Sequence, residues 1–130
     1  MARLVLDSSV LIAYFNAVDA HHASAITRLR RASGDECVLI ASVLAEILVH
    51  PYRVGPEAVS EVEAALAALR MVVLPIDAGL ARRAAELRAS NTRLRFGDAL
   101  VIAAGDALDA EVVTADASWS RISRRVRVLS

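Results

Sequence analysis

The sequence predicts a three-layer α/β domain, in which a parallel β-sheet of about five strands is flanked by helices. Short runs rich in β-branched residues alternate along the chain with longer segments of helical spacing, an order typical of parallel strands joined by helices. The short runs are apolar throughout, as strands covered on both faces are. The chain has 130 residues without a repeat or a linker, so residues 1–130 are expected to form a single domain.

Five short runs are the expected strands: residues 4–6, 38–40, 72–74, 112–114 and 126–129. After the first strand, Asp19 can cap a helix that runs to about residue 32. Ser42 can cap the next helix, which Pro51 should end because a proline disfavours the helical conformation of the residue before it. These signals place one helix on each side of the second strand in the chain.

Three further helices are predicted from the residues at their starts. Pro56 suits a first helical turn and precedes the helical pattern of residues 57–69. Asp77 can cap a helix over residues 78–89, and another helix begins at or near Gly97 and runs to residue 108. Strands and helices therefore alternate in the way that a parallel sheet covered on both faces requires.

Four acidic residues interrupt or end the apolar segments: Asp7, Glu46, Asp98 and Asp116. Asp7 and Asp116 each follow a strand-like run, so parallel strands would deliver both to the carboxyl edge of the sheet, where open α/β folds place their sites. The segment that carries Glu46 leaves the sheet by the same edge. Asp98 begins a late helix, whose start would lie at the far edge unless the preceding connection turns the chain.

Composition narrows the class of protein. The charge is balanced, with fifteen basic and fifteen acidic residues, and every basic residue is an arginine, whose planar side chain pairs well with phosphate. Cys37 is the only cysteine and lies in an apolar run, which excludes an internal disulfide and a thiolate-rich metal site. The apolar run before Asp7 is too short for a signal-peptide core, and no uncharged stretch approaches the roughly 20 residues of a membrane span. A soluble, cytoplasmic protein without membrane contact is expected.

Four motifs, in order, carry a resemblance to a known family. They are DSSVLI at residues 7–12, AEIL at residues 45–48, DALVIAA at residues 98–104 and VTAD at residues 113–116. With these motifs the chain resembles PIN-domain ribonucleases, and specifically the VapC-like toxins of type II toxin–antitoxin pairs, over essentially its whole length. The resemblance implies that the four acids meet in one pocket, act in catalysis and bind Mg²⁺ or Mn²⁺. It also implies cleavage of RNA, a small antitoxin protein as partner, and a homodimer.

The residue types fit this chemistry independently of the resemblance. Carboxylate oxygens without cysteine or histidine favour hard cations, and Mg²⁺ typically keeps several waters when one or two carboxylates bind it. Such a site lowers the pKa of a bound water and neutralises the charge that develops on a phosphodiester. Ser8, Ser9 and Thr114 are candidates for holding a metal-bound water. Alternatively, Ser8 and Ser9 cap the helical segment of residues 10–15.

Each acid also has a local explanation. Asp7 can be a helix cap and Asp116 a turn former, while Glu46 can be an exposed helix residue. Asp98 can be an acid that the helix dipole favours at an N-terminus. Four such coincidences would have to reproduce one family pattern, so we prefer the joint interpretation as a site.

Other function classes lack residues that they need. A phosphatase of the haloacid dehalogenase type would have an aspartate where Ser9 stands, and a receiver domain or a P-loop NTPase would have a lysine, which the chain lacks. A dinucleotide-binding fold would have a glycine-rich turn after the first strand. The alternative that stays open is a catalytically inactive PIN-like domain that serves as a protein-interaction module.

Arginines near the acids are candidates for contacts with RNA. Arg93 and Arg95 precede Asp98 and can reach an RNA phosphate beside the site. Four more arginines form a C-terminal cluster: Arg121, Arg124, Arg125 and Arg127. This cluster either lines the route of the RNA or forms a solvated face, which is the more frequent meaning of such a run. Trp119 is expected to pack against the end of the sheet rather than to stack on a base.

Apolar residues make up 56 % of the chain, more than the roughly 45–50 % usual in soluble domains. A domain of this size cannot bury them all, so an exposed apolar surface used by partners is expected. Its expected contributors are Leu11, Ile12, Tyr14, Phe15 and the helix of residues 57–69. In the family that the chain resembles, such a surface makes the homodimer and receives the antitoxin.

Overall fold

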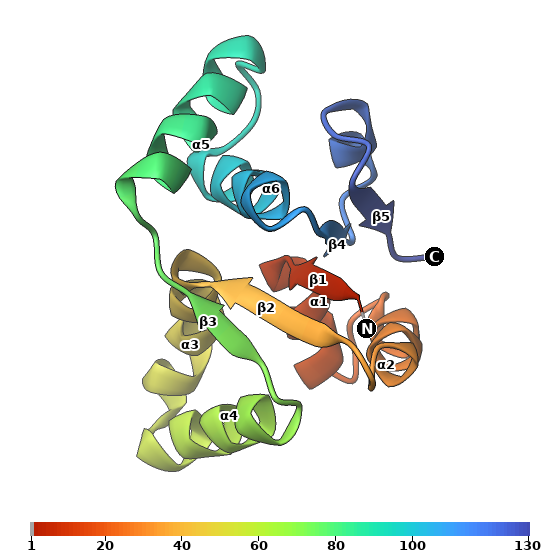
Figure 1. Cartoon of the computed structure of the whole chain (residues 1–130). Coiled ribbons are helices and arrows are strands. Elements are labelled where there is room, and N and C mark those ends of the chain that lie inside the picture. The colour runs from red at the N-terminus through yellow and green to blue at the C-terminus, as the bar shows by residue number, and fades with distance from the viewer. Residues whose placement is uncertain (1) are drawn as a thin grey trace.

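The computed structural model describes residues 2–130, which form an α/β fold built on one five-stranded parallel sheet (Figure 1). Its strands are β1 (Arg3–Leu6), β2 (Glu36–Ile40), β3 (Val72–Leu74), β4 (Glu111–Thr114) and β5 (Val126–Val128). They lie in the order β3-β2-β1-β4-β5, so the first strand is in the centre. Val5 of β1 pairs with Val38 on one side and with Val112 on the other. The five predicted strands and their parallel arrangement are confirmed.

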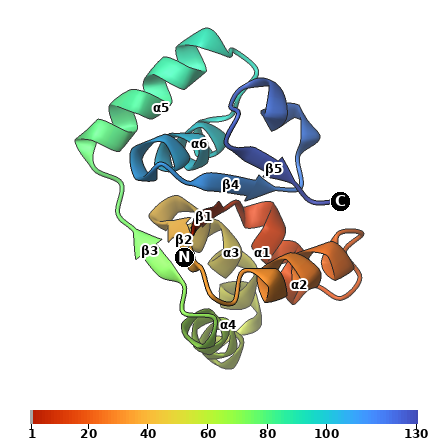
Figure 2. The ribbon, with the colours of Figure 1, turned by 45° about the vertical axis from the view of Figure 1, so that its right-hand side comes forward.

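Helices flank the sheet on both sides. They are α1 (Ser8–Phe15), α2 (His22–Arg31), α3 (Ala41–Val54), α4 (Pro56–Ala68), α5 (Ala78–Ser90) and α6 (Phe96–Leu108), and a short 3₁₀ helix, η1 (Ala117–Arg121), precedes β5. Figure 2 shows α5 and α6 on one side of the sheet and α1 to α4 on the other, which gives the three predicted layers. Asp77 caps α5 as predicted, because its Oδ1 accepts from the Leu80 N–H at 2.8 Å. No helix in this part of the chain is both long and apolar enough to span a membrane.

Two predicted helix caps are wrong. α2 has His21 at its cap position, and Asp19 accepts instead from the His21 backbone N–H, at 2.8 Å, in the turn before the helix. α3 follows β2 directly, with Ile40 at the cap position, so no residue is left between strand and helix to act as a side-chain cap. Ser42 lies inside the helix, and its buried hydroxyl has no hydrogen-bond partner within residues 2–130.

Pro51 does not end α3, contrary to the prediction. The helix continues to Val54 and stops at Gly55, whose φ of 150° is a conformation that favours glycine. Pro51 is buried near the C-terminal end of the helix and lines a groove there. A proline inside a helix costs roughly 3 kcal/mol, and burial of its apolar ring opposes this cost.

The core is built around β1, whose Leu4, Val5 and Leu6 are at most 1 % exposed. α6 approaches the sheet closely because Gly105 has no side chain, and a Cβ at this position would overlap the Val112 side chain. Cys37 and Trp119 are buried, as predicted. β1 and β4 are thus held in the interior, and their C-terminal ends have fixed positions at one edge of the sheet.

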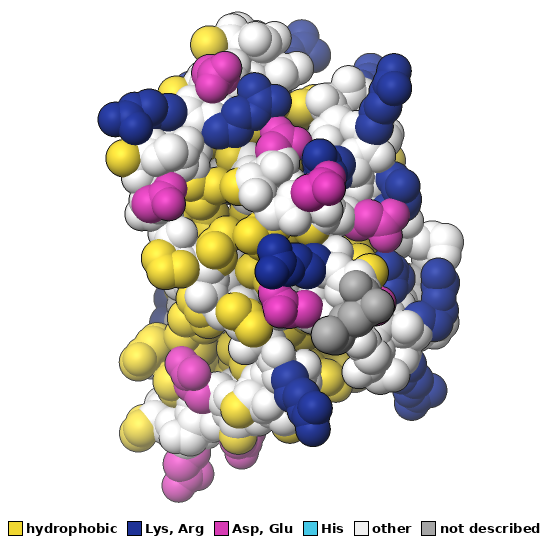
Figure 3. All heavy atoms as spheres, in the orientation of Figure 1, with side chains coloured by type: hydrophobic (Ala, Val, Ile, Leu, Met, Phe, Trp, Pro, Cys, Tyr) yellow, Lys and Arg dark blue, Asp and Glu magenta, His cyan; other side chains and the backbone are white. Residues whose placement is uncertain are grey.

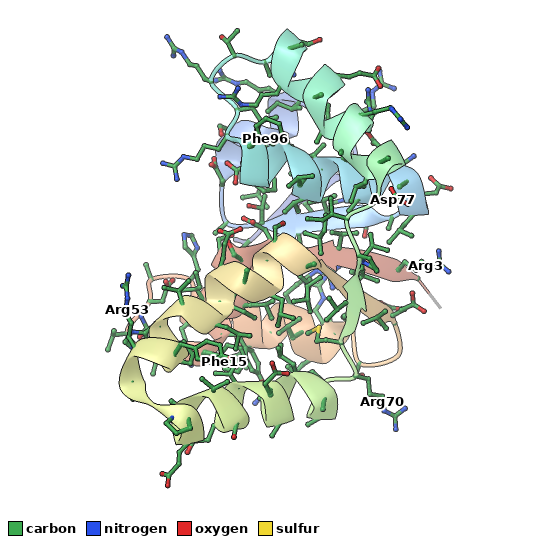
Figure 4. All side chains as sticks on the ribbon, turned by 90° about the vertical axis from the view of Figure 1, so that its left-hand side faces the viewer. Arg3, Phe15, Arg53, Arg70, Asp77 and Phe96 are labelled. Atoms are coloured by element: carbon green, nitrogen blue, oxygen red, sulfur yellow. The ribbon has the colours of Figure 1, made fainter. Side chains whose placement is uncertain are left out.

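The expected exposed apolar surface is present, but Leu11 does not belong to it. Leu11 lies on the buried face of α1 and is fully buried, whereas Ile12 and Phe15 are 44 % and 37 % exposed. Figure 4 shows Phe15 between α3 and α4. Other apolar side chains gather on the left of Figure 3, over β3 and the chain that leads into α5, where Val73 and Ile76 are exposed.

Candidate active site

The four acidic residues singled out in the sequence line one cavity of about 780 Å³ at the carboxyl edge of the sheet. Asp7 and Asp116 follow β1 and β4. Glu46 lies in α3, and Asp98 lies in the first turn of α6. The loop of residues 91–95 turns the chain between α5 and α6, so α6 begins at this edge and brings Asp98 to the other three acids. The sequence of strands and helices alone had not determined at which edge of the sheet Asp98 would lie.

Asp7 forms the floor of the cavity, with only 6 % of its surface exposed. Its Oδ1 caps α1 by accepting from the Ser8 N–H at 2.8 Å. Its Oδ2 accepts from the hydroxyls of Ser9, at 2.7 Å, and Thr114, at 2.8 Å. Hydrogen bonds to a carboxylate are stronger than those between neutral groups, so together they fix the direction of this side chain.

The hydroxyls beside Asp7 have different roles. Thr114 Oγ1 accepts from the Asp116 N–H at 3.1 Å and is fully buried outside the cavity lining. The contact of Thr114 with a metal-bound water stays a prediction, and in the structure its hydroxyl donates to Asp7 and helps to position that carboxylate. Ser9 lines the cavity and likewise binds both Asp7 and the backbone after β4. Ser8 also lines the cavity, and its hydroxyl donates to Glu46 Oε2 at 3.2 Å.

Asp98 and Asp116 lie in opposite electrostatic environments. Burial, and then the nearby Asp7 carboxylate, raises the pKa of Asp98 to about 6; the other two acids of the cavity add to this, and Arg95 opposes it. The pKa of Asp116 is lowered, mainly because Ser118 donates to it from its hydroxyl at 2.6 Å and from its backbone N–H at 2.9 Å. The pKa of Asp98 is thus moved toward neutral pH, as is common for acids in functional sites.

Ser118 is a cavity residue that sequence reasoning misses. Its two hydrogen bonds to Asp116 hold that carboxylate at the start of η1. Aspartate side chains commonly bind the backbone two residues further on, so the spacing from Asp116 to Ser118 is the signal that identifies it.

The carboxylate set suits a divalent cation that keeps part of its water shell. No three His, Cys, Asp or Glu side chains of residues 2–130 are grouped closely enough to form a ready metal cage. Mg²⁺ does not require one, because it typically binds through one or two carboxylates and retains several waters. The repulsion from neighbouring carboxylates that helps to raise the pKa of Asp98 is also the interaction that a bound cation would relieve.

Three arginines line the same cavity: Arg93, Arg95 and Arg121. Arg93 and Arg95 belong to the loop before α6, as the sequence suggested. Arg95 is near enough to Asp98 and Asp116 to lower the pKa of both. The cavity therefore has carboxylates and guanidinium groups on its walls, which are the groups that bind cations and phosphates respectively.

The fold divides the predicted C-terminal cluster of arginines. Arg121 is the member that lines the cavity. Arg125 forms two ion pairs with aspartates at the end of α6, at 3.3 and 2.5 Å, and Arg127 binds Glu111 at 2.8 Å. Arg125 and Arg127 thus have structural partners, and the cluster is not one continuous basic surface.

A second, apolar groove of about 740 Å³ lies between α1, α3 and α4. Ile12, Phe15, Val54 and Val62 contribute to its lining. Glu46 lines both this groove and the carboxylate cavity. The groove and the carboxylate cavity are therefore neighbours, and a peptide bound at the Glu46 end of the groove would lie close to the acids.

The parallel sheet and the four acids at its carboxyl edge place the chain among open α/β proteins, whose sites lie where the strands end. The family model described as the PIN domain matches residues 4–125. The chain belongs to the PIN domain family, as its motifs predict.

Solved structures share this fold. A toxin–antitoxin complex from Klebsiella pneumoniae matches with a TM-score of 0.81 and 19 % identity, over 98 % of each chain. VapBC2 from Rickettsia felis, bound to a DNA fragment from its promoter, matches with a TM-score of 0.77 and 16 % identity, over 98 % of this chain and 99 % of that one. VapC20 from Mycobacterium tuberculosis, described as a toxin that cleaves the sarcin–ricin loop, matches with a TM-score of 0.73 and 24 % identity, over 91 % and 93 %. No curated protein sequence matches the chain.

Proposed function

We propose that the chain is an Mg²⁺- or Mn²⁺-dependent endoribonuclease, that it works as a single domain, and that it is the toxin of a toxin–antitoxin pair. The observation that carries the proposal is the convergence of four carboxylates, from separate elements, on one cavity of a PIN domain. Acids that served only as local caps or turn formers would have no reason to share a cavity. The toxins among the structural neighbours support the same assignment.

The proposed metal-binding and catalytic residues are Asp7, Glu46, Asp98 and Asp116. When bound, the metal supplies charge neutralisation and a water of lowered pKa beside the phosphodiester. Asp7 offers a carboxylate whose direction is fixed by three hydrogen bonds. Burial and the neighbouring carboxylates raise the pKa of Asp98 to about 6 in the metal-free protein, and a bound cation would favour the charged form that can bind it.

Ser8, Arg93 and Arg95 are the proposed supporting residues. Ser8 holds Glu46 through its hydroxyl and is the candidate for contact with a metal-bound water. Arg93 and Arg95 lie on the loop wall of the cavity and contact the phosphates of the RNA. Arg95 also keeps the Asp98 carboxyl group from becoming still less acidic.

We further propose a cognate antitoxin and a homodimer as the protein partners. Neighbours such as the Klebsiella complex contain a toxin together with its antitoxin. The apolar groove between α1, α3 and α4 suits an apolar helix of the antitoxin, and its shared residue Glu46 explains how an occupant reaches the acids. The exposed apolar side chains around Val73 offer a separate surface for a second copy.

The proposal is tested by incubating the chain with total RNA and Mg²⁺ or Mn²⁺ and sequencing the new RNA ends. We expect cleavage at one or a few defined sites, loss of cleavage in EDTA, and a loss of at least about a hundredfold in Asp98→Asn. Asp106→Asn is the matched control, because Asp106 lies in the same helix and binds Arg83 and Arg125 outside the cavity.

Equal cleavage by Asp98→Asn and by the wild type would contradict the proposal and indicate a contaminating nuclease. Antitoxin binding without any cleavage would favour the alternative of an inactive interaction module.

A further inference from the structure

Eight of the fifteen arginines can be compared by their ion pairs. Five form ion pairs with acidic side chains: Arg3, Arg28, Arg83, Arg125 and Arg127. The three that line the carboxylate cavity form none within the described part of the chain. Cations at the cavity are therefore not used to hold the fold together, although they stand beside four carboxylates.

These three arginines come from two separate segments of the cavity lining. Arg93 and Arg95 lie on the loop between α5 and α6. Arg121 ends η1, the 3₁₀ helix that follows Asp116. Each segment adjoins one of the acids along the chain, because Asp98 follows the loop and Asp116 precedes η1.

Arg121 stands on a rigid support. Trp119 anchors η1 in the core with 2 % of its surface exposed. Asp116 caps η1 through Ser118, and the Ile122 N–H closes the last turn on the Trp119 carbonyl at 2.9 Å. The backbone that carries the exposed Arg121 side chain therefore has a fixed position beside the proposed catalytic acids.

A cavity with four carboxylates repels RNA unless cations lie along the path of its backbone. Balanced overall charge means that no global field supplies this attraction. We propose that Arg121 binds an RNA phosphate at the η1 part of the cavity, in addition to the phosphates bound by Arg93 and Arg95 at the loop. The RNA then contacts both segments, whereas Arg125 and Arg127, which pair with acidic side chains, do not bind it. This inference rests on the proposed nuclease function and adds a third phosphate-binding residue to it.

The salt dependence of RNA binding tests this inference. A fluorescein-labelled single-stranded RNA that contains a mapped cleavage site is titrated against the protein by anisotropy, between roughly 50 and 200 mM salt. All variants carry Asp98→Asn, so that the RNA stays intact. Each phosphate contact to a single strand contributes about 0.7 to the slope of log affinity against log salt. We expect Arg121→Gln to lower the slope by about that amount, and Arg121→Lys to keep it because the charge remains.

Two further variants serve as matched controls. Arg82→Gln removes an exposed arginine of α5 that lines none of the cavities described, and Arg127→Gln removes an arginine paired with Glu111. We expect both to leave the slope unchanged. An equal loss of slope in Arg121→Gln and Arg82→Gln, or a loss in Arg127→Gln as large as in Arg121→Gln, overturns the inference. Cleavage of the RNA by Asp98→Asn itself would instead contradict the proposed function, so the two failures are distinguishable.

Discussion

The two sides of the carboxylate cavity are built differently. On the side of β1 and β4, Asp7 is buried and accepts three hydrogen bonds from its surroundings. On the side of α6, Asp98 is partly buried beside other carboxylates, and its pKa is raised to about 6. The Asp7 side stabilises the fold with or without a metal, whereas the Asp98 side opposes folding until a cation binds. Acids that share one site therefore differ in what they contribute to the free energy of unfolding.

Replacing Asp7 should have the largest effect on stability. Asp7→Ala removes the cap of α1 and leaves the hydroxyls of Ser9 and Thr114 without their acceptor. We expect a loss of about 3 kcal/mol in the free energy of unfolding in EDTA, and a larger loss in Mn²⁺, because Asp7 is also one of the proposed metal ligands. Urea unfolding measures it, and Asp7→Asn, which keeps an acceptor oxygen, should lose less. An unchanged unfolding midpoint for Asp7→Ala would show that the hydrogen-bonded side is not a source of stability.

Thr114→Val tests the buried hydroxyl that supports Asp7. The substitution keeps the shape of the side chain but removes the hydroxyl that binds Asp7 and the Asp116 N–H. We expect a loss of about 1 to 2 kcal/mol, because the change leaves hydrogen-bonding groups without a partner. Thr114→Ser, which keeps the hydroxyl, is the control. Identical urea curves for the valine and serine variants would argue against the role of this hydroxyl in positioning Asp7.

Asp98→Asn tests the α6 side of the cavity through the pH dependence of stability. The folded pKa of about 6 lies above the ordinary value of 3.8, so the stability associated with this group is complete below about pH 4 and is lost as the pH rises to about 6. In EDTA at pH 7, Asp98→Asn should therefore melt at the same temperature as the wild type or higher, and the difference should shrink toward pH 4. The variant should also lose most of the stabilisation that millimolar Mn²⁺ gives the wild type.

Melting curves at both pH values, with EDTA and with Mn²⁺, measure these effects. A lower melting temperature for Asp98→Asn in EDTA at pH 7, with an intact response to Mn²⁺, would contradict the assignment of Asp98 to a repulsive metal site.

Ser8→Ala should have the smallest effect on stability. Its hydroxyl binds Glu46 at the solvent-exposed mouth of the cavity, where water can replace it. We expect a change within about 0.5 kcal/mol in urea unfolding, and a reduced cleavage rate, because Glu46 loses the group that holds it. Ser120→Ala, which removes a hydroxyl bonded within η1, is the control for both measurements. Unchanged cleavage by Ser8→Ala would exclude Ser8 from the site.

The fold was largely predictable because its strands are short, apolar and rich in β-branched residues. The same property placed Asp7 and Asp116, since each directly follows such a run. Asp98 was different: only the resemblance to a family brought it to the site, because the turn of residues 91–95 has no strong sequence signal. Tertiary contacts of this kind decide where a helix begins in space, and local pattern does not encode them.

Three of the errors in prediction concern buried groups. Pro51 is buried within α3, and Ser42 lies within the same helix because the chain passes directly from a buried strand into it. Leu11 was expected at the surface, yet it is fully buried. At these positions tertiary context overrode the local signals for a cap, a break and exposure.

The hydrogen bond between Thr114 and Asp7 joins residues that are 107 positions apart. β1 is the central strand, and it has β4 as a neighbour only after most of the chain has been made. During synthesis the chain emerges at about 5–20 residues per second, and its early segments wait for their late partners. A growing chain on the ribosome thus cannot assemble the four acids until residue 116 has emerged. The order of strands in the sheet therefore makes the cavity a late product of synthesis, although its first acid is the seventh residue of the chain.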